Sequence, residues 1–489
     1  MSKTISISHT TLLYLGLITA FLLRLFNLNF EGLWNDELFT AYSADPSRSL
    51  GWTIKYVGGD VHPPLHNILS KYWAENFGYN DTSLRMLNVV IGTIGVLSVY
   101  HVGKALFNKK VAIAALWLAV VNSFLIEYSQ EVRAYILLFV LANYSYYFFV
   151  KILYNALKRS YIISYVLLTA AALYTHYFAL FIIASQGIAL LFLMDYSELK
   201  NRWKSYVLMF IMPIVLFGPW IPYFLRHSKQ PFVWIQKAEL GMIFSYPQAF
   251  FNDLVVGSLV VLLILLTILY FTLGRVIRIK ALEKAVGEHK KSLLLILIWI
   301  VVYFGIPFVR SFISTSNMND RYFIVLVCPL ILVLAYPISL LNKKNTRRIA
   351  LAIVVAYSLL NITLNTQPYF DNKGMYRDIV EEVEDIEATT PILYLTARTR
   401  NFDYYLRQNK YRQLRRRTED FDKFMTENDP KEYVVFIDLH HKMYGLDKVL
   451  EQNKLHYPGY ELVVVKEKAN INNIKTARFL HYKKVDTPL

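Results

Sequence analysis

Long apolar runs separated by short polar segments fill the first 365 residues of the chain. A helix needs roughly 20 apolar residues to cross about 30 Å of hydrocarbon. Runs close to that length cover residues 11–28, 83–103, 111–126, 134–150, 161–175, 177–194, 205–224, 254–273, 292–310, 322–341 and 349–365. The pattern therefore predicts eleven transmembrane helices. The first run lacks a small-residue cleavage site, which is typical of an uncleaved signal anchor.

From about residue 366 the pattern changes to that of a water-soluble domain. A charged helical pattern, three strand-like runs and a basic segment follow, at residues 376–387, 392–396, 433–439, 460–466 and 403–417. A stretch of about 120 residues is long enough for one small α/β domain. We therefore expect a membrane all-α domain over residues 1–365 and an α/β domain over residues 366–489.

The basic residues predict the orientation of the predicted helices. Nineteen Lys and Arg residues lie in alternate short loops, at residues 104–110, 151–159, 200–204, 275–291 and 343–348, against nine in the opposite set. Cytoplasmic loops retain Lys and Arg. We therefore expect a multi-pass protein of the inner (cytoplasmic) membrane, with a cytoplasmic N-terminus and an extracytoplasmic C-terminal domain.

Composition supports a membrane protein and narrows its partners. Hydrophobic residues make up 55% of the chain and charged residues 18%, whereas soluble domains are roughly 45–50% apolar and about 25% charged. The net charge of +16 is explained by a basic cytoplasmic face against anionic lipid, so we expect the lipid bilayer and no nucleic acid as a partner. The single cysteine, Cys328, excludes an intramolecular disulfide and a cysteine zinc site.

The first outer loop, residues 29–81, carries the first candidate chemistry. Asp36 and Glu37 follow closely on the first predicted helix, and an amphipathic stretch spans residues 65–77. A carboxylate at the hydrocarbon boundary is partly desolvated and can act as a general base. The alternative is that both acids are simply solvated.

The second outer loop places Glu131, Arg133 and Tyr135 at the ends of two predicted helices. If the segment is helical, Glu131 and Tyr135 share a face. An arginine outside opposes the positive-inside trend and suits a phosphate. An ion pair of Arg133 with a nearby glutamate is the alternative.

Two further outer loops carry His176, Arg321 and Tyr322. His62 and His176 could contribute to a divalent metal site with a carboxylate. Their spacing gives that site no specific support, and a histidine at a helix end is more often a capping or interfacial residue.

These segments together resemble the GT-C superfamily of membrane glycosyltransferases. The similarity is to the bacterial branch related to dolichyl-phosphate-mannose protein mannosyltransferases and aminoarabinose transferases. It rests on Leu33-Trp34-Asn35-Asp36-Glu37, His62-Pro63-Pro64-Leu65, Tyr128-Ser129-Gln130-Glu131-Val132-Arg133-Ala134-Tyr135, Thr175-His176-Tyr177, and Arg321-Tyr322 followed by Pro329.

The resemblance implies a GT-C-like helix bundle with amphipathic helices in its first outer loop. It also implies inverting transfer of a sugar from a polyprenyl-phosphate donor to a lipid, glycan or protein acceptor. Asp36 matches the acid that activates the acceptor, with Glu37 and Glu131 as further carboxylates. Arg133, Arg321 and His176 are the candidates to hold the phosphate, and His62, Tyr135 and Tyr322 complete the expected substrate site.

Two other classes remain open at this stage. A membrane transporter would show charges within its helices, and Arg24 is the clear example here, although its side chain can extend to the interface. A non-catalytic membrane protein of envelope glycan assembly would also fit. The C-terminal region lacks a Trp-Trp-Asp signature, so the sugar and the acceptor stay open.

Overall fold

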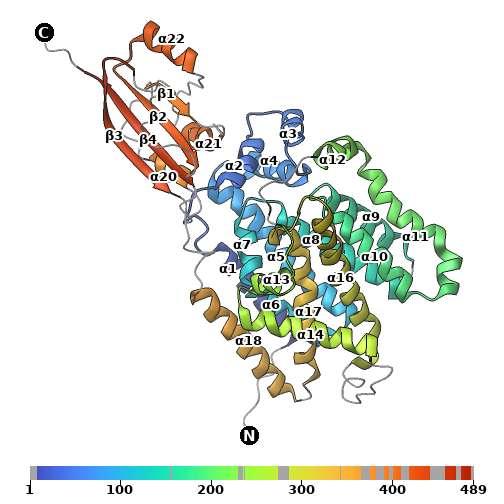
Figure 1. Ribbon diagram of the computed structural model, residues 1–489. Coiled ribbons are helices and arrows are strands. Elements are labelled where there is room, and N and C mark those ends of the chain that lie inside the picture. Colours follow the sequence, from blue (N-terminus) through green and yellow to red (C-terminus); the bar gives the residue numbers. More distant parts are fainter. Residues whose placement is uncertain are drawn as a thin grey trace. The chain divides into compact units, whose positions relative to one another are not determined.

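The computed structural model describes residues 8–154, 157–229, 235, 237–273, 286–341, 343–364, 375–381, 390–395, 400–408, 418–440, 457–469 and 475–485. The chain forms two compact units (Figure 1). Unit 1 comprises Met1–Phe26, Pro46–Gly78 and Ser83–Pro368, and unit 2 comprises Asn27–Asp45, Tyr79–Thr82 and Tyr369–Leu489. Two pieces of the first outer loop, which the sequence placed in the membrane domain, thus fold with the C-terminal unit.

Unit 1 is built of helices. Its elements are α1 (His9–Leu25), α3 (Leu50–Val57), α4 (Leu65–Phe77), α5 (Asp81–Leu106), α6 (Lys109–Val120), α7 (Ser123–Gln130), α8 (Tyr135–Tyr154), α9 (Arg159–Leu173), α10 (Ala179–Leu193), α11 (Tyr196–Leu216), η1 (Gly218–Trp220), α12 (Ile221–His227), α13 (Met242–Phe251), α14 (Leu254–Leu273), η2 (Gly287–His289), α16 (Lys290–Ile313), η3 (Asp320–Leu326), α17 (Val327–Leu340) and α18 (Lys344–Leu364). The first two residues of α5 belong to unit 2. The predicted amphipathic helix at residues 65–77 is α4.

Six helical segments among the described residues are long and apolar enough to cross a membrane: α5, α8, α14, α16, α18 and the continuous η3–α17. Two bent pairs pass the same test together, α6–α7 with a bend of 58° and α11–α12 with a bend of 45°. The shorter apolar helices are α1, α9 and α10. Each predicted run therefore falls on a helix or a bent pair, while the count of eleven crossings stays a prediction.

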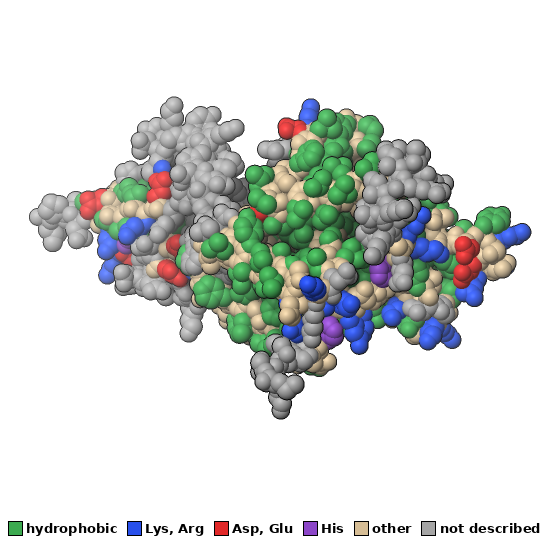
Figure 2. All heavy atoms as spheres, turned by 90° about the horizontal axis from the view of Figure 1, so that it is seen from below, with side chains coloured by type: hydrophobic (Ala, Val, Ile, Leu, Met, Phe, Trp, Pro, Cys, Tyr) green, Lys and Arg blue, Asp and Glu red, His purple; other side chains and the backbone are tan. Residues whose placement is uncertain are grey.

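The surface of unit 1 carries the exposed apolar side chains that a lipid-facing helix bundle requires. Large exposed hydrophobic side chains lie on α14 and α18, among them Leu254, Leu262, Ile349 and Ile353. Figure 2 shows a broad area of hydrophobic side chains on one face, with Lys and Arg side chains gathered beside it. Burying this much apolar surface in lipid instead of water is strongly favourable.

Arg24 of α1 does not extend to the membrane surface. It is fully buried, and its guanidinium donates to the carbonyls of Ala119 and Val120, at 3.3 and 3.4 Å, and to Ser129 Oγ at 3.1 Å. Those carbonyls end α6, where the helix dipole is negative and the orphan acceptors need donors. Arg24 thus stabilises the break between α6 and α7, a structural role that explains its charge without a transport path.

Unit 2 contains a four-stranded sheet in the order β1-β2-β4-β3. The strands are β1 (Ile392–Leu395), β2 (Glu432–His440), β3 (Tyr460–Ala469) and β4 (Lys475–Lys484). β1 and β2 are parallel, and β4 pairs antiparallel with both β2 and β3. The three predicted strands are present, whereas β4 was missed because four of its ten residues are Lys or Arg.

Helices cover the sheet of unit 2 on both faces. They are α20 (Met375–Glu381), α21 (Arg400–Gln408) and α22 (Thr418–Asn428), and α2 (Asn35–Ser43) packs against α21. Met425 of α22 belongs to one apolar cluster with Tyr433 and Leu480, while Phe402 of α21 contacts Phe436 of β2, with ring centroids 4.8 Å apart. Alternate strand residues point to opposite faces, so both faces of the sheet contribute buried side chains, whereas Leu462, Val463 and Val465 of the edge strand β3 are exposed. Part of the predicted helix at 376–387 and of the basic segment at 403–417 lies outside the described residues.

Candidate functional site

Four predicted outer loops of unit 1 meet at the ends of its helices. The Leu65 amide donates to the Tyr174 carbonyl at 2.9 Å, and the His62 and His176 rings lie 5.5 Å apart. The ring of Tyr135 lies 6.1 Å from His176 and 6.1 Å from Tyr322. Segments that are far apart in the sequence therefore share one aromatic cluster.

Two arginines approach this cluster from different loops. The guanidinium carbon of Arg133 lies 6.0 Å from the Tyr135 ring centroid, and that of Arg321 lies 5.4 Å from it. Arg133 is buried, and Glu131 and Asp320 lie within electrostatic range of nearby Tyr128. Planar guanidinium groups held against an aromatic ring can grip a phosphate with two parallel hydrogen bonds.

A polar relay fixes the loop that carries Arg133. His66 Nε2 lies 2.9 Å from Asn88 Oδ1, and the Asn88 amide donates to the carbonyls of Glu131 and, at 3.0 Å, Arg133. Burial lowers the pKa of His66 to about 4, with the charge of Arg133 acting in the same direction. Residues 131–134 are not helical. Glu131 and Tyr135 therefore do not share the helix face that we expected if this segment were helical.

Asp60 and His62 form a hydrogen-bonded pair in the same region. His62 Nδ1 lies 3.0 Å from Asp60 Oδ2. Burial opposes ionisation of Asp60, but the hydrogen bond and charge of His62, together with Arg133, outweigh it and lower the pKa of Asp60 to about 2. An ionised carboxylate orients the imidazole and stabilises its protonated form. The sequence analysis missed Asp60, although its position two residues before His62 was a usable signal.

His176 is buried and neutral at physiological pH. Burial lowers its pKa well below the ordinary value, and the charges of His62, Arg133 and Arg321 add to the effect. Its Nδ1 accepts from the Phe178 amide at 3.2 Å. The proton therefore sits on Nε2, which leaves an N–H donor for an oxygen of a substrate.

An apolar cavity of about 300 Å³ lies among α13, α14, α16 and η3–α17. Tyr246 and Phe250 of α13 are in its lining. Ring contacts connect Phe250 to Phe124 at 5.1 Å, Phe124 to Tyr128 at 4.7 Å, and Tyr128 to Tyr135 at 5.4 Å. A continuous aromatic path thus joins the apolar cavity to the ring that both arginines approach.

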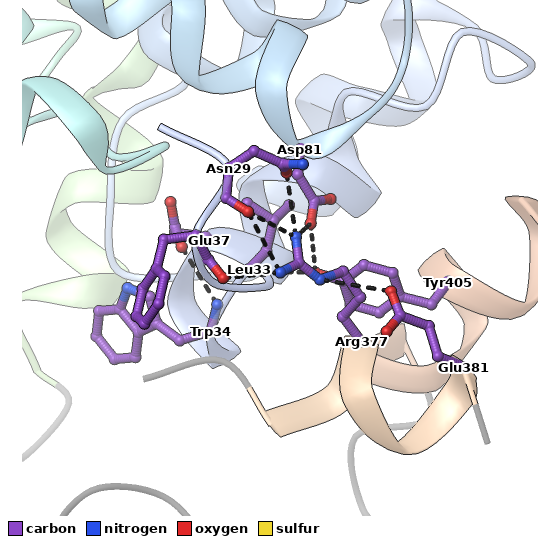
Figure 3. A network of polar contacts seen from close by, with 9 residues as sticks. Asn29, Leu33, Trp34, Glu37, Asp81, Arg377, Glu381 and Tyr405 are labelled. Carbon is purple, nitrogen blue, oxygen red and sulfur yellow. Dashed lines mark hydrogen bonds and ion pairs between the residues drawn. The ribbon is translucent and has the colours of Figure 1, made fainter. Parts of the chain in front are cut away.

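Asp36 and Glu37 lie in unit 2, on the first turn of α2. Figure 3 shows Glu37 beside Trp34. Glu37 is buried and its Oε2 accepts from the Trp34 amide at 3.2 Å, so it stabilises the start of its own helix. Asp36 is only half-buried, and its Oδ1 accepts from the Asn35 side chain at 3.1 Å. Of the two acids, Asp36 is therefore the better placed for chemistry.

The structure thus brings together His62, Arg133, Tyr135, His176, Arg321 and Tyr322 within unit 1, and it places Asp36 and Glu37 in unit 2. Glu131 ends α7 beside this cluster. Within the described part of the chain, no group of three His, Cys, Asp or Glu side chains is arranged to hold a metal ion. The divalent metal therefore has no ligand set there.

Comparisons with known proteins agree with this architecture. Residues 61–223 match the family model of dolichyl-phosphate-mannose-protein mannosyltransferase, and no curated protein sequence matches the chain. The structure resembles ArnT from Cupriavidus metallidurans bound to undecaprenyl phosphate, with a TM-score of 0.60, 13% identity, and 96% of this chain and 97% of that chain covered.

It also resembles the Archaeoglobus fulgidus oligosaccharyltransferase AglB in complex with an inhibitory peptide and a dolichol-phosphate. That match has a TM-score of 0.52 and 11% identity, and covers 87% of this chain and 69% of that chain. The chain therefore has the fold of the GT-C superfamily of membrane glycosyltransferases, and its residues 61–223 are similar to the dolichyl-phosphate-mannose-protein mannosyltransferase family.

Proposed function

We propose that this protein is an integral membrane glycosyltransferase. It transfers a sugar from a polyprenyl-phosphate donor to a lipid, glycan or protein acceptor at the outer face of the cytoplasmic membrane. One observation carries this proposal: two arginines approach one tyrosine ring, which an aromatic path connects to an apolar cavity. A phosphate attached to a long hydrocarbon chain has a charged group that suits the two arginines and an apolar chain that suits the cavity.

The unit 1 residues would act on the leaving group. As the bond between the anomeric carbon and the phosphate oxygen breaks, its electron pair passes to the lipid phosphate. Arg133 and Arg321 stabilise that developing charge, and the Nε2–H of His176 donates to a phosphate or sugar oxygen. A phosphate leaves readily, so no separate general acid is required.

Asp36 would act on the acceptor. An acceptor hydroxyl or amine attacks the anomeric carbon on the face opposite the phosphate, which inverts the configuration, and its proton passes to the Asp36 carboxylate. The hydrogen bond from Asn35 keeps that carboxylate in one orientation. Glu37 stabilises the start of α2, and Glu131 stabilises the loop that carries Arg133. The Asp60–His62 pair of unit 1 is the second candidate base, because the Asp60 carboxylate orients the His62 imidazole.

The similar structures support a lipid phosphate as the donor class. The ArnT complex holds undecaprenyl phosphate, and the AglB complex holds a dolichol-phosphate. Both carry a phosphate on a polyprenyl chain, which is the chemistry that the arginines and the apolar cavity suit here.

The direct test incubates the purified full chain with radiolabelled polyprenyl-phosphate sugars and a panel of acceptors. We expect covalent transfer to one acceptor class, and its loss in Asp36→Asn. In proteoliposomes, flux of a sugar or an ion without covalent transfer would instead establish a transporter and overturn the proposal.

The proposed orientation has its own test. In a Cys328→Ser background, Lys423→Cys places a thiol on an exposed position of α22. A membrane-impermeant reagent added to intact spheroplasts should label it without lysis. Labelling only after lysis would place the C-terminal unit in the cytoplasm.

A further inference from the structure

The chain around the start of α2 is held by helices from the far end of the sequence. Within unit 2, α2 packs against α21, and α20 packs against α21. Figure 3 shows Arg377 of α20 and Tyr405 of α21 directed at the segment from Asn29 to Glu37. The contacts reach the backbone of that segment rather than only its side chains.

Arg377 makes the most extensive of these contacts. Its guanidinium donates to the carbonyl of Asn29 at 3.3 Å, to the side-chain oxygen of Asn29 at 3.1 Å, and to the carbonyl of Phe30 at 3.0 Å. It also lies 3.6 Å from Asp81 Oδ2. The planar guanidinium group can satisfy several acceptors at once, which a lysine cannot do.

Tyr405 completes the same network. Its hydroxyl accepts from the Leu33 amide and donates to Asp81 Oδ2 at 3.0 Å. Tyr405 and Asp81 are buried, so solvent cannot replace these bonds at no cost. Leu33, which lies two residues before the start of α2, is therefore held by α21.

A second path leads directly to Asp36. The buried side chain of Asn401 donates from Nδ2 to Asn35 Oδ1 at 3.2 Å, and Asn35 Nδ2 donates to Asp36 Oδ1 at 3.1 Å. Asn401 binds the oxygen of the Asn35 side-chain amide, so the nitrogen of that amide faces the Asp36 carboxylate. Reversing that amide would turn an oxygen toward Asp36.

We propose that the C-terminal domain is a positioning element for the proposed catalytic acid, with Arg377, Tyr405 and Asn401 as positioning residues that act through the α2 segment on Asp36. The proposal rests on the proposed function and assigns a role to the C-terminal domain. It makes transfer depend on residues that need not touch either substrate. A carboxylate displaced by about 1 Å can lose on the order of 100-fold in rate.

Three variants test the proposal in the full chain: Arg377→Gln, Tyr405→Phe and Asn401→Asp. The last keeps its shape but cannot donate to Asn35 Oδ1. Lys423→Gln on exposed α22 is the matched control, because it removes a charge from the same unit outside the network. Arg377→Lys tests whether charge alone is enough.

Transfer kinetics are normalised to the number of donor-binding sites, measured with polyprenyl phosphate, so that misfolded protein does not lower the apparent rate. We expect kcat to fall by about 10- to 100-fold with KM for the donor unchanged. Lys423→Gln should match the wild type, and Arg377→Lys should recover only part of the rate. An unchanged kcat in all three variants would overturn the proposal.

Hydrogen exchange gives a readout independent of activity. We expect faster amide exchange over residues 29–43 in the three variants and unchanged exchange over α4, because only the first segment is held by α20 and α21. Unchanged exchange over residues 29–43 would overturn the proposed contacts. A wild-type protein without transfer activity would instead overturn the proposed function, even where the exchange results show that α2 is held.

Discussion

The loop that carries Arg133 and the helix that carries Asp36 are held in opposite ways. Arg133 is fixed within unit 1 by Asn88 of α5, which precedes it by 45 residues in the membrane domain. Asp36 is fixed within unit 2 through Asn35, which accepts a hydrogen bond from Asn401, 366 residues further along the sequence. The position of Arg133 thus depends on packing within the helix bundle. The position of Asp36 depends on residues of the C-terminal unit that lie far away in the sequence.

This difference separates two kinds of failure. Damage near Arg133 should weaken the binding of the donor phosphate, whereas damage near Asp36 should leave binding intact and slow the chemical step.

The largest effect is expected from Asp36→Asn. Removing a positioned general base typically costs about 10²- to 10⁴-fold in rate, and donor binding should persist because Arg133 and Arg321 are unchanged. Measuring transfer beside polyprenyl-phosphate binding separates the two. If Asp60→Asn abolishes transfer while Asp36→Asn does not, the base belongs to the Asp60–His62 pair of unit 1 instead.

Arg321→Gln should weaken donor binding by about 10- to 100-fold, because a hydrogen bond to a charged group contributes about 1.5–3 kcal/mol. We expect most of the change in KM for the donor. Arg310→Gln is the control, since Arg310 of α16 donates to the Thr315 carbonyl. Equal effects of both substitutions would argue against a specific phosphate site at Arg321.

Gly92→Ala should destabilise unit 1 by about 2 kcal/mol, the cost of leaving buried polar groups unsatisfied. A Cβ at Gly92 would overlap the Ser129 side chain, which bonds to Arg24 at the α6–α7 break. Gly187→Ala is the control, because nothing lies within 4 Å of the added atom. Thermal unfolding in detergent should give a lower melting temperature for Gly92→Ala than for Gly187→Ala. Equal melting temperatures would contradict a stabilising role of the Arg24 contacts.

The smallest expected effect is on the pH dependence of stability. The pKa of His66 is about 4 in the folded chain against 6.5 for the free residue. Below pH 6.5 the unfolded chain takes up a proton that the folded chain does not. Stability is therefore greatest above pH 6.5 and falls as the pH drops toward 4.

His66→Gln should flatten that dependence, while His9→Gln at an exposed position of α1 should leave it unchanged. Melting temperatures between pH 7.5 and 4.5 provide the measurement, with all other conditions held constant. A slope that is equal in the wild type and in His66→Gln would assign the acid sensitivity to other groups, such as buried His176.

The sequence predicted the helices of unit 1 well because lipid imposes a local requirement. Each helix must present apolar side chains over its whole length, so the run of residues is itself the signal. The amphipathic pattern at residues 65–77 likewise gave the bounds of α4. Strand β4 was missed for the opposite reason, since four of its ten residues are Lys or Arg and the buried residues Phe479, Leu480 and Tyr482 form only a short run.

The residue types of the candidate site could also be named from the sequence, because arginine, histidine and carboxylate chemistry is local to each side chain. Their grouping could not. The contact of His62 with His176, and the approach of Arg133 and Arg321 to one ring, depend on which helix ends pack together. Asp60 was missed although His62 lies only two residues away, because that spacing alone does not show that the two side chains turn toward each other.

The sequence by itself therefore determined the membrane class, the helical runs and the candidate residues, since each rests on hydrophobicity or charge along a short segment. Only the tertiary structure decided that Arg24 is buried at a helix break and that the helix with Asp36 folds with the C-terminal unit. Both outcomes rest on hydrogen bonds between segments 95 or more residues apart, and no local pattern encodes such pairings.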